Sequence, residues 1–218
     1  MTGQTGARRA MLAAAAALVA FALAVPARAG TEVSPPADAI TIDVVAVNGS
    51  GCPAGTAAVA VSPDHTAFRV TYTRFTARTG GGAAATDVRK NCQLALSIHV
   101  PQGFTYAIAR ADYRGFAHLE RDAGALLRTN YYFQGSSEDT FVDHTFTGPL
   151  HDYWHVTDTT RSADLVYAPC GVDRILNVNT QLRVGGGGGR TGAASYITMR
   201  ATNGKVDTIY HFSWKRCS

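Results

Sequence analysis

Hydrophobic and polar residues alternate with a period of two through much of this chain. In the segment CQLALSIHV (Cys92–Val100), every second residue is apolar and most of the residues between them are polar. The same alternation recurs in FRVTYT (Phe68–Thr73), LNVNTQLRV (Leu176–Val184) and DTIYHFSW (Asp207–Trp214). Because successive side chains of a β-strand point to opposite faces, the pattern indicates strands with one face on a core. No convincing amphipathic helix follows the first thirty residues.

Further strand-like segments are separated by turn signals such as SPDH, PQG and TNGK. These segments are Ile40–Val47, Thr56–Val61, Phe104–Leu119, Ala125–Gln134, Thr140–Gly148, Ala163–Ala168 and Ser195–Ala201. About ten short strands joined by Gly, Pro and Asn turns predict an all-β fold, an antiparallel β-sandwich of jelly-roll-like type.

The N-terminus has the three-part pattern of a secretory signal peptide. Two arginines precede the apolar run MLAAAAALVAFALAV, and a small-x-small cleavage site ends at Ala29. The run is shorter than the roughly 20 residues of a membrane-spanning helix, which favours cleavage over an uncleaved anchor. We therefore expect a secreted protein with no membrane segment after cleavage, exported by either the general or the twin-arginine route. The expected parts are a signal peptide at 1–29, a linker at 30–39 and a single domain at 40–218.

The charge balance argues against a nucleic-acid-binding protein. The full sequence has 20 basic and 16 acidic residues, but three of the arginines belong to the leader. The mature chain is therefore close to neutral, whereas a nucleic-acid binder needs a clustered basic face.

Four cysteines in the mature chain predict two disulfides, because the count is even and the chain is exported. Zinc ligation is the alternative, but no two of these cysteines have the close spacing of a structural zinc site. Of the three possible pairings we favour Cys52–Cys92 and Cys170–Cys217, since each closes a loop of moderate length. Cys52, within NGSGCPAG, is then a structural crosslink. This motif lacks the lysine of a phosphate-binding loop and the cations that stabilise a reactive thiolate.

The densest group of polar side chains runs from Ser136 to Asp158. Histidines and carboxylates bind metals and transfer protons near neutral pH, so this segment could form a site. However, the spacing of His151 and His155 spreads them over about 13 Å on a strand, and Gly148-Pro149 argues against a helix. The pattern favours a polar strand face plus a loop, with Trp154 as a core or edge anchor, and no metal or cofactor is expected. The candidate ligand or active-site residues are Asp143, His144, His151, Asp152, Trp154 and His155.

Glycoside hydrolysis and sugar binding would each use residue types that the sequence contains. Hydrolysis needs two facing carboxylates, and the spacing selects no pair from Asp112, Glu120, Asp122, Asp143 and Asp152. Sugar stacking needs exposed aromatic rings, for which the candidates are Tyr131, Tyr132, Tyr153 and Trp154. No G-x-S-x-G nucleophile elbow is present.

Several short motifs follow one another along the mature chain. They are GSGCP at 49–53, NCQLALSIHVPQGF at Asn91–Phe104, DYRGFAHL at Asp112–Leu119, YYFQG at Tyr131–Gly135, CGVDRILNVN at Cys170–Asn179 and a cysteine near the end. Together they resemble a family of small secreted proteins of bacteria and fungi, a domain of unknown function. The resemblance implies secretion, paired cysteines and one β-rich domain. It brings no established activity and no catalytic residues, and the polar run from Asp143 to Asp158 is not part of it.

We expect a secreted, non-enzymatic interaction module whose partners are cell-envelope or matrix glycans. The alternative is a secreted hydrolase that uses carboxylates or a metal from the Asp143–Asp158 region, and a third class is a protein inhibitor or toxin-like effector. A deep pocket with converging carboxylates and histidines would favour the enzyme. A flat or grooved aromatic strip would favour the binder.

Overall fold

The computed structural model describes residues 33–136, 141–186, 192–201 and 205–217. These residues fall within the unit Glu32–Ser218. The expected signal peptide at 1–29 lies outside the described residues and stays a prediction. The described part of the expected linker packs on the domain, because Val33 contacts the core and the carbonyl oxygen of Pro36 lies 3.0 Å from Nδ1 of His65.

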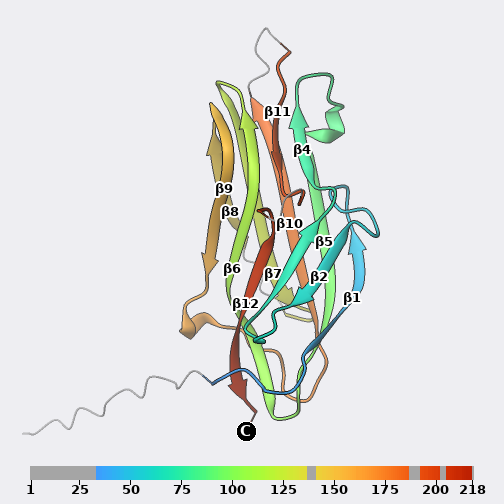
Figure 1. The fold of residues 1–218 in the computed structure, drawn as a ribbon, viewed down its shortest axis with the longest axis vertical. Helices are drawn as coiled ribbons and strands as arrows, with labels where there is room; N and C mark the ends of the chain where they lie inside the picture. Colours follow the sequence, from blue (N-terminus) through green and yellow to red (C-terminus); the bar gives the residue numbers. More distant parts are fainter. Residues whose placement is uncertain (1–32, 137–140, 187–191, 202–204, 218) are drawn as a thin grey trace, which may run out of the picture. The chain divides into compact units, whose positions relative to one another are not determined.

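The described residues form two antiparallel sheets, which confirms the all-β expectation (Figure 1). The five-stranded sheet has the order β1-β5-β10-β7-β8. Its strands are β1 (Thr41–Asn48), β5 (Arg89–His99), β7 (Ala123–Phe133), β8 (Val142–Thr147) and β10 (Ile175–Gly186).

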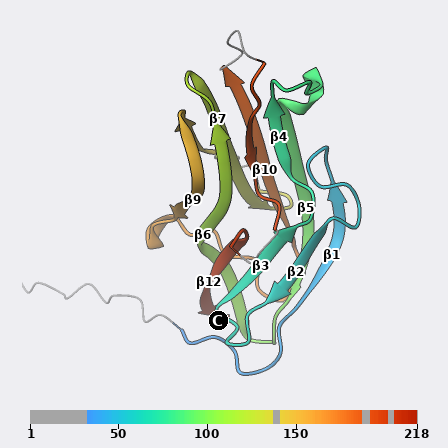
Figure 2. The same ribbon diagram turned by 45° about the horizontal axis from the view of Figure 1, so that its top comes forward.

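The seven-stranded sheet is built around its longest strand, β6 (Phe104–Leu119). One edge of β6 pairs first with β12 and then with β11, and the other edge pairs with β9. Its other strands are β2 (Ala57–Val61), β3 (Ala67–Tyr72), β4 (Thr76–Thr79), β9 (Leu150–Thr159), β11 (Ser195–Thr198) and β12 (Thr208–Arg216). In Figure 1, β8 and β9 lie towards one edge of the sandwich and β1 and β2 towards the other, and Figure 2 shows the same placement of β9, β1 and β2.

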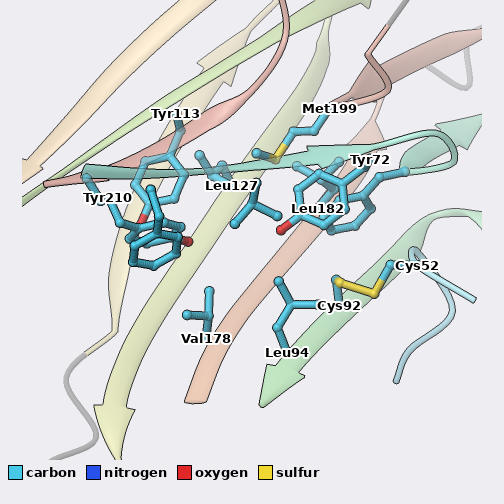
Figure 3. Close-up of a cluster of buried hydrophobic side chains, with 14 of the residues drawn as sticks. Cys52, Tyr72, Cys92, Leu94, Tyr113, Leu127, Val178, Leu182, Met199 and Tyr210 are labelled. Atoms are coloured by element: carbon cyan, nitrogen blue, oxygen red, sulfur yellow. A yellow bond between two sulfur atoms is a disulfide. The ribbon is translucent and has the colours of Figure 1, made fainter. Parts of the chain in front are cut away.

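The core lies between the sheets and is made by the apolar faces of the alternating strands. Leu94 and Leu96 of β5 face it from one sheet, and Phe68 and Val70 of β3 face it from the other. Burial of each side chain of this size stabilises the fold by about 1.5–3 kcal/mol. Figure 3 shows tyrosines and the Cys52–Cys92 disulfide in the same cluster. Burial raises the pKa of Tyr113 and Tyr210 well above the ordinary value, so both rings are neutral core members.

Strands β6 to β9 form a long ribbon of two paired chains that passes from one sheet to the other. One chain of the ribbon is β6 followed by β7, and the other is β8 followed by β9. β7 pairs with β8 in the five-stranded sheet, and β6 pairs with β9 in the seven-stranded sheet. The ribbon crosses between sheets at the β6–β7 turn and at Gly148, which follows β8. A Cβ atom at Gly148 would overlap the carbonyl oxygen of Glu120 and lie 3.1 Å from that of Leu119. Glycine therefore lets the two chains of the ribbon approach closely where they cross.

Both disulfides are present, with the favoured pairing of Cys52 with Cys92 and Cys170 with Cys217.

The prediction of a strand at Ala163–Ala168 is wrong. This segment contains a short 3₁₀ helix, Ser162–Asp164, and then an irregular stretch. Its last residue is held by separate bonds to β6, from Ala168 N to the carbonyl oxygen of Tyr106 (2.9 Å) and from Thr105 Oγ1 to the Ala168 carbonyl (2.6 Å). These bonds replace a regular ladder.

The described residues contain twelve strands, against about ten expected. β4 was not among the expected segments, whereas β9 coincides with the polar strand face predicted around Trp154. A second 3₁₀ helix spans Ala85–Asp87. No helix in the described part of the chain has the length and hydropathy needed to cross a membrane.

Candidate functional site

The structure divides the predicted polar cluster between the two sheets. Asp143 and His144 lie on β8 of the five-stranded sheet, whereas the residues from His151 to His155 lie on β9 of the seven-stranded sheet. The run from Asp143 to His155 is therefore continuous in the sequence but does not converge on one point in space.

Residues of β9 also alternate between the outside and the core. His151, Tyr153 and His155 are exposed, whereas Trp154 is only 7 % exposed and packs on Phe146 with ring centroids 5.1 Å apart. Trp154 is thus the hydrophobic anchor that the sequence predicted, and it is not available for sugar stacking.

The two acidic candidates at the ends of this region have local partners. Asp143 receives two hydrogen bonds of 2.6 Å from the Arg128 guanidinium, which hold the pKa of its carboxyl below the ordinary value. Asp152 is exposed, and its Oδ1 accepts a 2.7 Å bond from the backbone N–H of Tyr153. Neither contact brings a second carboxylate close.

An aromatic strip lies on the outer face of the seven-stranded sheet. Its rings touch one another across three neighbouring strands, with Phe116 at the centre. The centroid of Phe116 lies 5.2 Å from Tyr153, 5.1 Å from His151 and 6.1 Å from Tyr196. Tyr153 is 43 % exposed despite these contacts. The aromatic strip consists of Phe116 and His118 on β6, His151 and Tyr153 on β9, and Tyr196 on β11.

The register of the strands explains why these rings meet. On β6, the outward residues are those between the buried Tyr113, Gly115, Ala117 and Leu119. Phe116 is directly opposite Tyr153 on β9, and His118 is opposite both His151 on β9 and Tyr196 on β11. Opposite residues on one face of an antiparallel pair have neighbouring side chains. The strip is therefore a product of strand pairing.

A buried carboxylate, Asp112, organises the same face next to the strip. Its Oδ2 accepts bonds from Arg110 Nη2 at 2.7 Å and His211 Nε2 at 2.8 Å. Its Oδ1 accepts bonds from Thr157 Oγ1 at 2.7 Å and His155 Nε2 at 3.3 Å. Burial opposes ionisation of this carboxyl, but the bonds from Thr157, Arg110 and His211 outweigh it and hold the pKa of Asp112 well below the ordinary value. Asp112 is thus a fixed anion among cationic and polar side chains.

A second buried carboxylate, Asp207, lies on the same side of the sheet. Arg69 Nε is 3.3 Å from its Oδ2, and Arg114 Nη1 is 3.4 Å from its Oδ1. Nearby, Lys205 Nζ lies 5.2 Å from the centre of the Tyr153 ring. Charged side chains therefore flank the aromatic strip, and the buried Asp207 holds Arg69 and Arg114 in place.

A pocket of about 590 Å³ that is open to solvent is lined by residues of β7, β8, β9 and the segment that follows β9. At its wall, the buried Asp158 accepts a 2.7 Å bond from His144 Nε2 and a 2.8 Å bond from Thr129 Oγ1. Tyr131 and Tyr132, both candidates for sugar stacking, line this pocket. The hydroxyl of Tyr131 also forms a 3.0 Å hydrogen bond with Thr160. Asp158 already uses both oxygens for bonds that join the two sheets.

Neither Glu120 nor Asp152 forms a hydrolytic pair with Asp112. Glu120 is eight residues further along the β6 chain, about 26 Å away, and Asp152 is five positions along β9, about 17 Å away. Glycosidase carboxylates are about 5–9.5 Å apart. Among the described residues, no group of three or more His, Cys, Asp or Glu side chains is arranged to hold a metal ion.

Comparison with known proteins places the chain in a family. Residues 38–217 match the sequence profile of a domain of unknown function, DUF4360. The chain belongs to this DUF4360 family. A relative from the fungus Arthroderma benhamiae, an "Uncharacterized secreted protein", is 32% identical over 189 residues, which are 85% of this chain and 75% of the relative. Like that relative, this DUF4360 protein is secreted.

One solved structure shows a weak likeness to this DUF4360 chain. It is the enzymatically active domain of tailspike protein 4 from bacteriophage CBA120, with a TM-score of 0.25 and 9% sequence identity. The match covers 79% of this chain but only 19% of the phage chain. A likeness this weak bears on neither fold nor function.

Sequence reasoning found part of the outer face of this DUF4360 domain and missed the rest. His151, Tyr153 and His155 were recognised because they are close in sequence and chemically distinctive. Their partners Phe116 and His118 lie on another strand and were noted only as strand residues. Period-two alternation could have placed both on the outer face of β6, but only the register puts them opposite β9.

Proposed function

We propose that this secreted protein binds glycans without cleaving them, through the aromatic strip on the outer face of the seven-stranded sheet. The observation that carries the proposal is the cluster of partly exposed rings around Phe116, bordered by Tyr153 and Tyr196. The apolar C–H faces of sugar rings pack on such side chains, and exposed apolar surface of this kind marks interaction sites.

The polar border of the strip supports the same function. Sugar hydroxyls need hydrogen-bond partners, and the loss of water from a polar group is costly when no partner replaces it. Arg114 and Lys205 lie beside the rings, and Arg114 is oriented by the buried carboxylate of Asp207. Side chains held in this way lose little entropy on binding, which favours recognition by a preformed surface.

The test measures binding of the mature protein to a glycan array and to insoluble cell-wall material. We expect binding by the wild type and at least a tenfold loss for Tyr153→Ala/Tyr196→Ala. Phe141→Ala is the matched control, because Phe141 is 52 % exposed and lies outside the strip. It should bind as the wild type does.

The outcome also separates a binder from a hydrolase. Bound glycan should be recovered with its length unchanged by mass spectrometry. Shortened products would contradict the non-enzymatic role, and no binding to any glycan or cell-wall fraction would contradict the proposal as a whole.

A further inference from the structure

A pair of histidines on the outer face carries an inference that is independent of glycan binding. His118 of β6 and His151 of β9 are directly opposite in the strand register, and their Nδ1 atoms lie 2.6 Å apart. Their ring planes are nearly perpendicular, at 88°. Two imidazole nitrogens at this distance share one proton, so at least one of them directs a lone pair at the other.

The carboxylate of Glu120 determines which nitrogen of His118 carries its proton. Oε1 of Glu120 lies 3.2 Å from Nε2 of His118. A carboxylate accepts hydrogen bonds, so Nε2 carries the proton and donates it, and neutral His118 has its lone pair on Nδ1, facing His151. Histidines that bind metals have this same arrangement, in which the nitrogen away from the metal donates to a carboxylate.

We propose that His118 and His151 bind one divalent transition-metal ion of the Zn²⁺ and Cu²⁺ type through their Nδ1 atoms. Imidazole nitrogen is a preferred ligand of these ions, whereas Ca²⁺ and Mg²⁺ require oxygen. In the free pair, His151 donates its Nδ1 proton to the lone pair of His118. When the ion binds, this proton moves through solvent to Nε2 of His151, so both ligands are neutral imidazoles and no net proton is released.

The geometry needs only a small adjustment. Zinc–nitrogen bonds are about 2.0–2.1 Å long, which at a tetrahedral angle separates the two ligand nitrogens by about 3.4 Å. The two Nδ1 atoms at 2.6 Å must therefore move apart by less than about 1 Å, which a small rotation of two partly exposed side chains allows. Tyr196 stacks on His118 with centroids 5.6 Å apart, and Phe116 contacts His151, so both rings are held near this position.

The site is open on its outer side. The His118 side chain is 31 % exposed, and no third His, Cys, Asp or Glu of the described residues completes a metal-binding group with the pair. Water or an oxygen atom of a bound molecule would take the remaining coordination positions, as at metal sites that keep an open position.

The test titrates the full secreted protein with Zn²⁺ and, separately, Cu²⁺ in a non-chelating buffer, followed by calorimetry. We expect one ion per chain, and at least a tenfold weaker affinity for His118→Ala and for His151→Ala. Glu120→Gln should weaken binding about tenfold, the lower end of the range for residues that orient a ligand. In the Cu²⁺ form, electron paramagnetic resonance should show coupling to two imidazole nitrogens.

His99→Ala is the matched control, since His99 lies on the five-stranded sheet beside Asp43. It should keep the wild-type affinity, and circular dichroism should show that every variant retains its strands. The proposal is overturned if the wild type binds neither ion at about 100 µM, or if both histidine variants bind as well as the wild type. An equal loss in His99→Ala would also overturn it, because the ion would then bind surface histidines in general. No glycan is present, so failure here leaves the glycan proposal untouched.

Discussion

His144 on β8 and Asp158 on β9 join the two sheets at the edge of the sandwich, with Nε2 of His144 2.7 Å from Oδ1 of Asp158. The carboxylate is buried, and its other oxygen accepts a bond from Thr129 on β7. A buried charge needs partners for each oxygen, because its desolvation is otherwise uncompensated. The contact is therefore a structural link across the pocket wall.

We expect His144→Ala to lower the free energy of unfolding by about 1–3 kcal/mol, because it leaves one oxygen of Asp158 buried without its donor. Urea denaturation followed by fluorescence measures this difference. His99→Ala is the control: His99 pairs with Asp43 at the surface, and exposed ion pairs contribute about 0–1 kcal/mol. Equal small effects of both substitutions would show that the His144 link adds no stability.

Gly115 makes room for the buried indole beneath the aromatic strip. It is opposite Trp154 in the register, and a Cβ atom would overlap the indole and lie 2.5 Å from the carbonyl oxygen of Thr198. We expect Gly115→Ala to lower the free energy of unfolding by about 1–3 kcal/mol, because the added methyl group overpacks the site. Urea denaturation measures this difference. Gly185→Ala is the control, since no atom lies within 4 Å of its added Cβ. It should be neutral or slightly stabilising, and a neutral Gly115→Ala would contradict the packing.

Alternation was sufficient to predict most strands and their buried faces. The pattern correctly places on the buried face Leu94, Leu96, Leu176 and Val178. A strand with one buried face has apolar residues at every second position, so its buried face can be read from the sequence. The failure at Ala163–Ala168 has a physical cause: a short apolar segment can be held by a few single bonds to a neighbour as well as by a ladder. Composition cannot distinguish these two cases.

The candidate site was less predictable, since it depends on register between distant segments. His118 and His151 are 33 residues apart and meet only because β6 and β9 pair at one offset. A shift by one residue would send every side chain to the opposite face. Similarly, nothing local indicates that the chain crosses between sheets after His144, which separates it from His151. At the crossing, Gly148 lies too close to the carbonyl oxygen of Glu120 for a residue with a Cβ atom.

The two disulfides close loops of similar size but differ in their surroundings. The cysteines of the first pair are 40 residues apart and those of the second are 47 apart, so chain entropy predicts about 4 kcal/mol for each. Cys52 and Cys92 are buried in the core, whereas Cys170 is exposed. We expect Cys170→Ala/Cys217→Ala to lower the free energy of unfolding by about 4 kcal/mol. Cys52→Ala/Cys92→Ala should lower it more, because this double substitution also leaves a cavity in the core. Guanidinium denaturation gives both values, and equal losses would argue against a packing role for the first pair.

Asp112 should make stability depend on pH in acid. Its pKa in the folded protein is well below the ordinary value of about 3.9 that applies to the unfolded chain. The carboxyl therefore stabilises the fold fully above about pH 5, and this contribution is lost as the pH falls below about 4, where the unfolded chain takes up the proton first. We expect Asp112→Asn to be less stable than the wild type by about 2–3 kcal/mol at pH 7, since it removes hydrogen bonds from charged groups. The difference should shrink steadily between pH 5 and pH 2 in urea titrations.

Asp143→Asn is the matched control for this dependence. The carboxyl of Asp143 is also stabilised by an arginine, and its pKa is lowered too. However, its side chain is 40 % exposed, and water screens an exposed pair far more than a buried one. At pH 7, Asp143→Asn should therefore lower the free energy of unfolding much less than Asp112→Asn does. If the two variants were equally stable, or if the difference between wild type and Asp112→Asn grew on acidification, the ionised Asp112 would not be what holds Arg110, His155 and His211 together on the outer face.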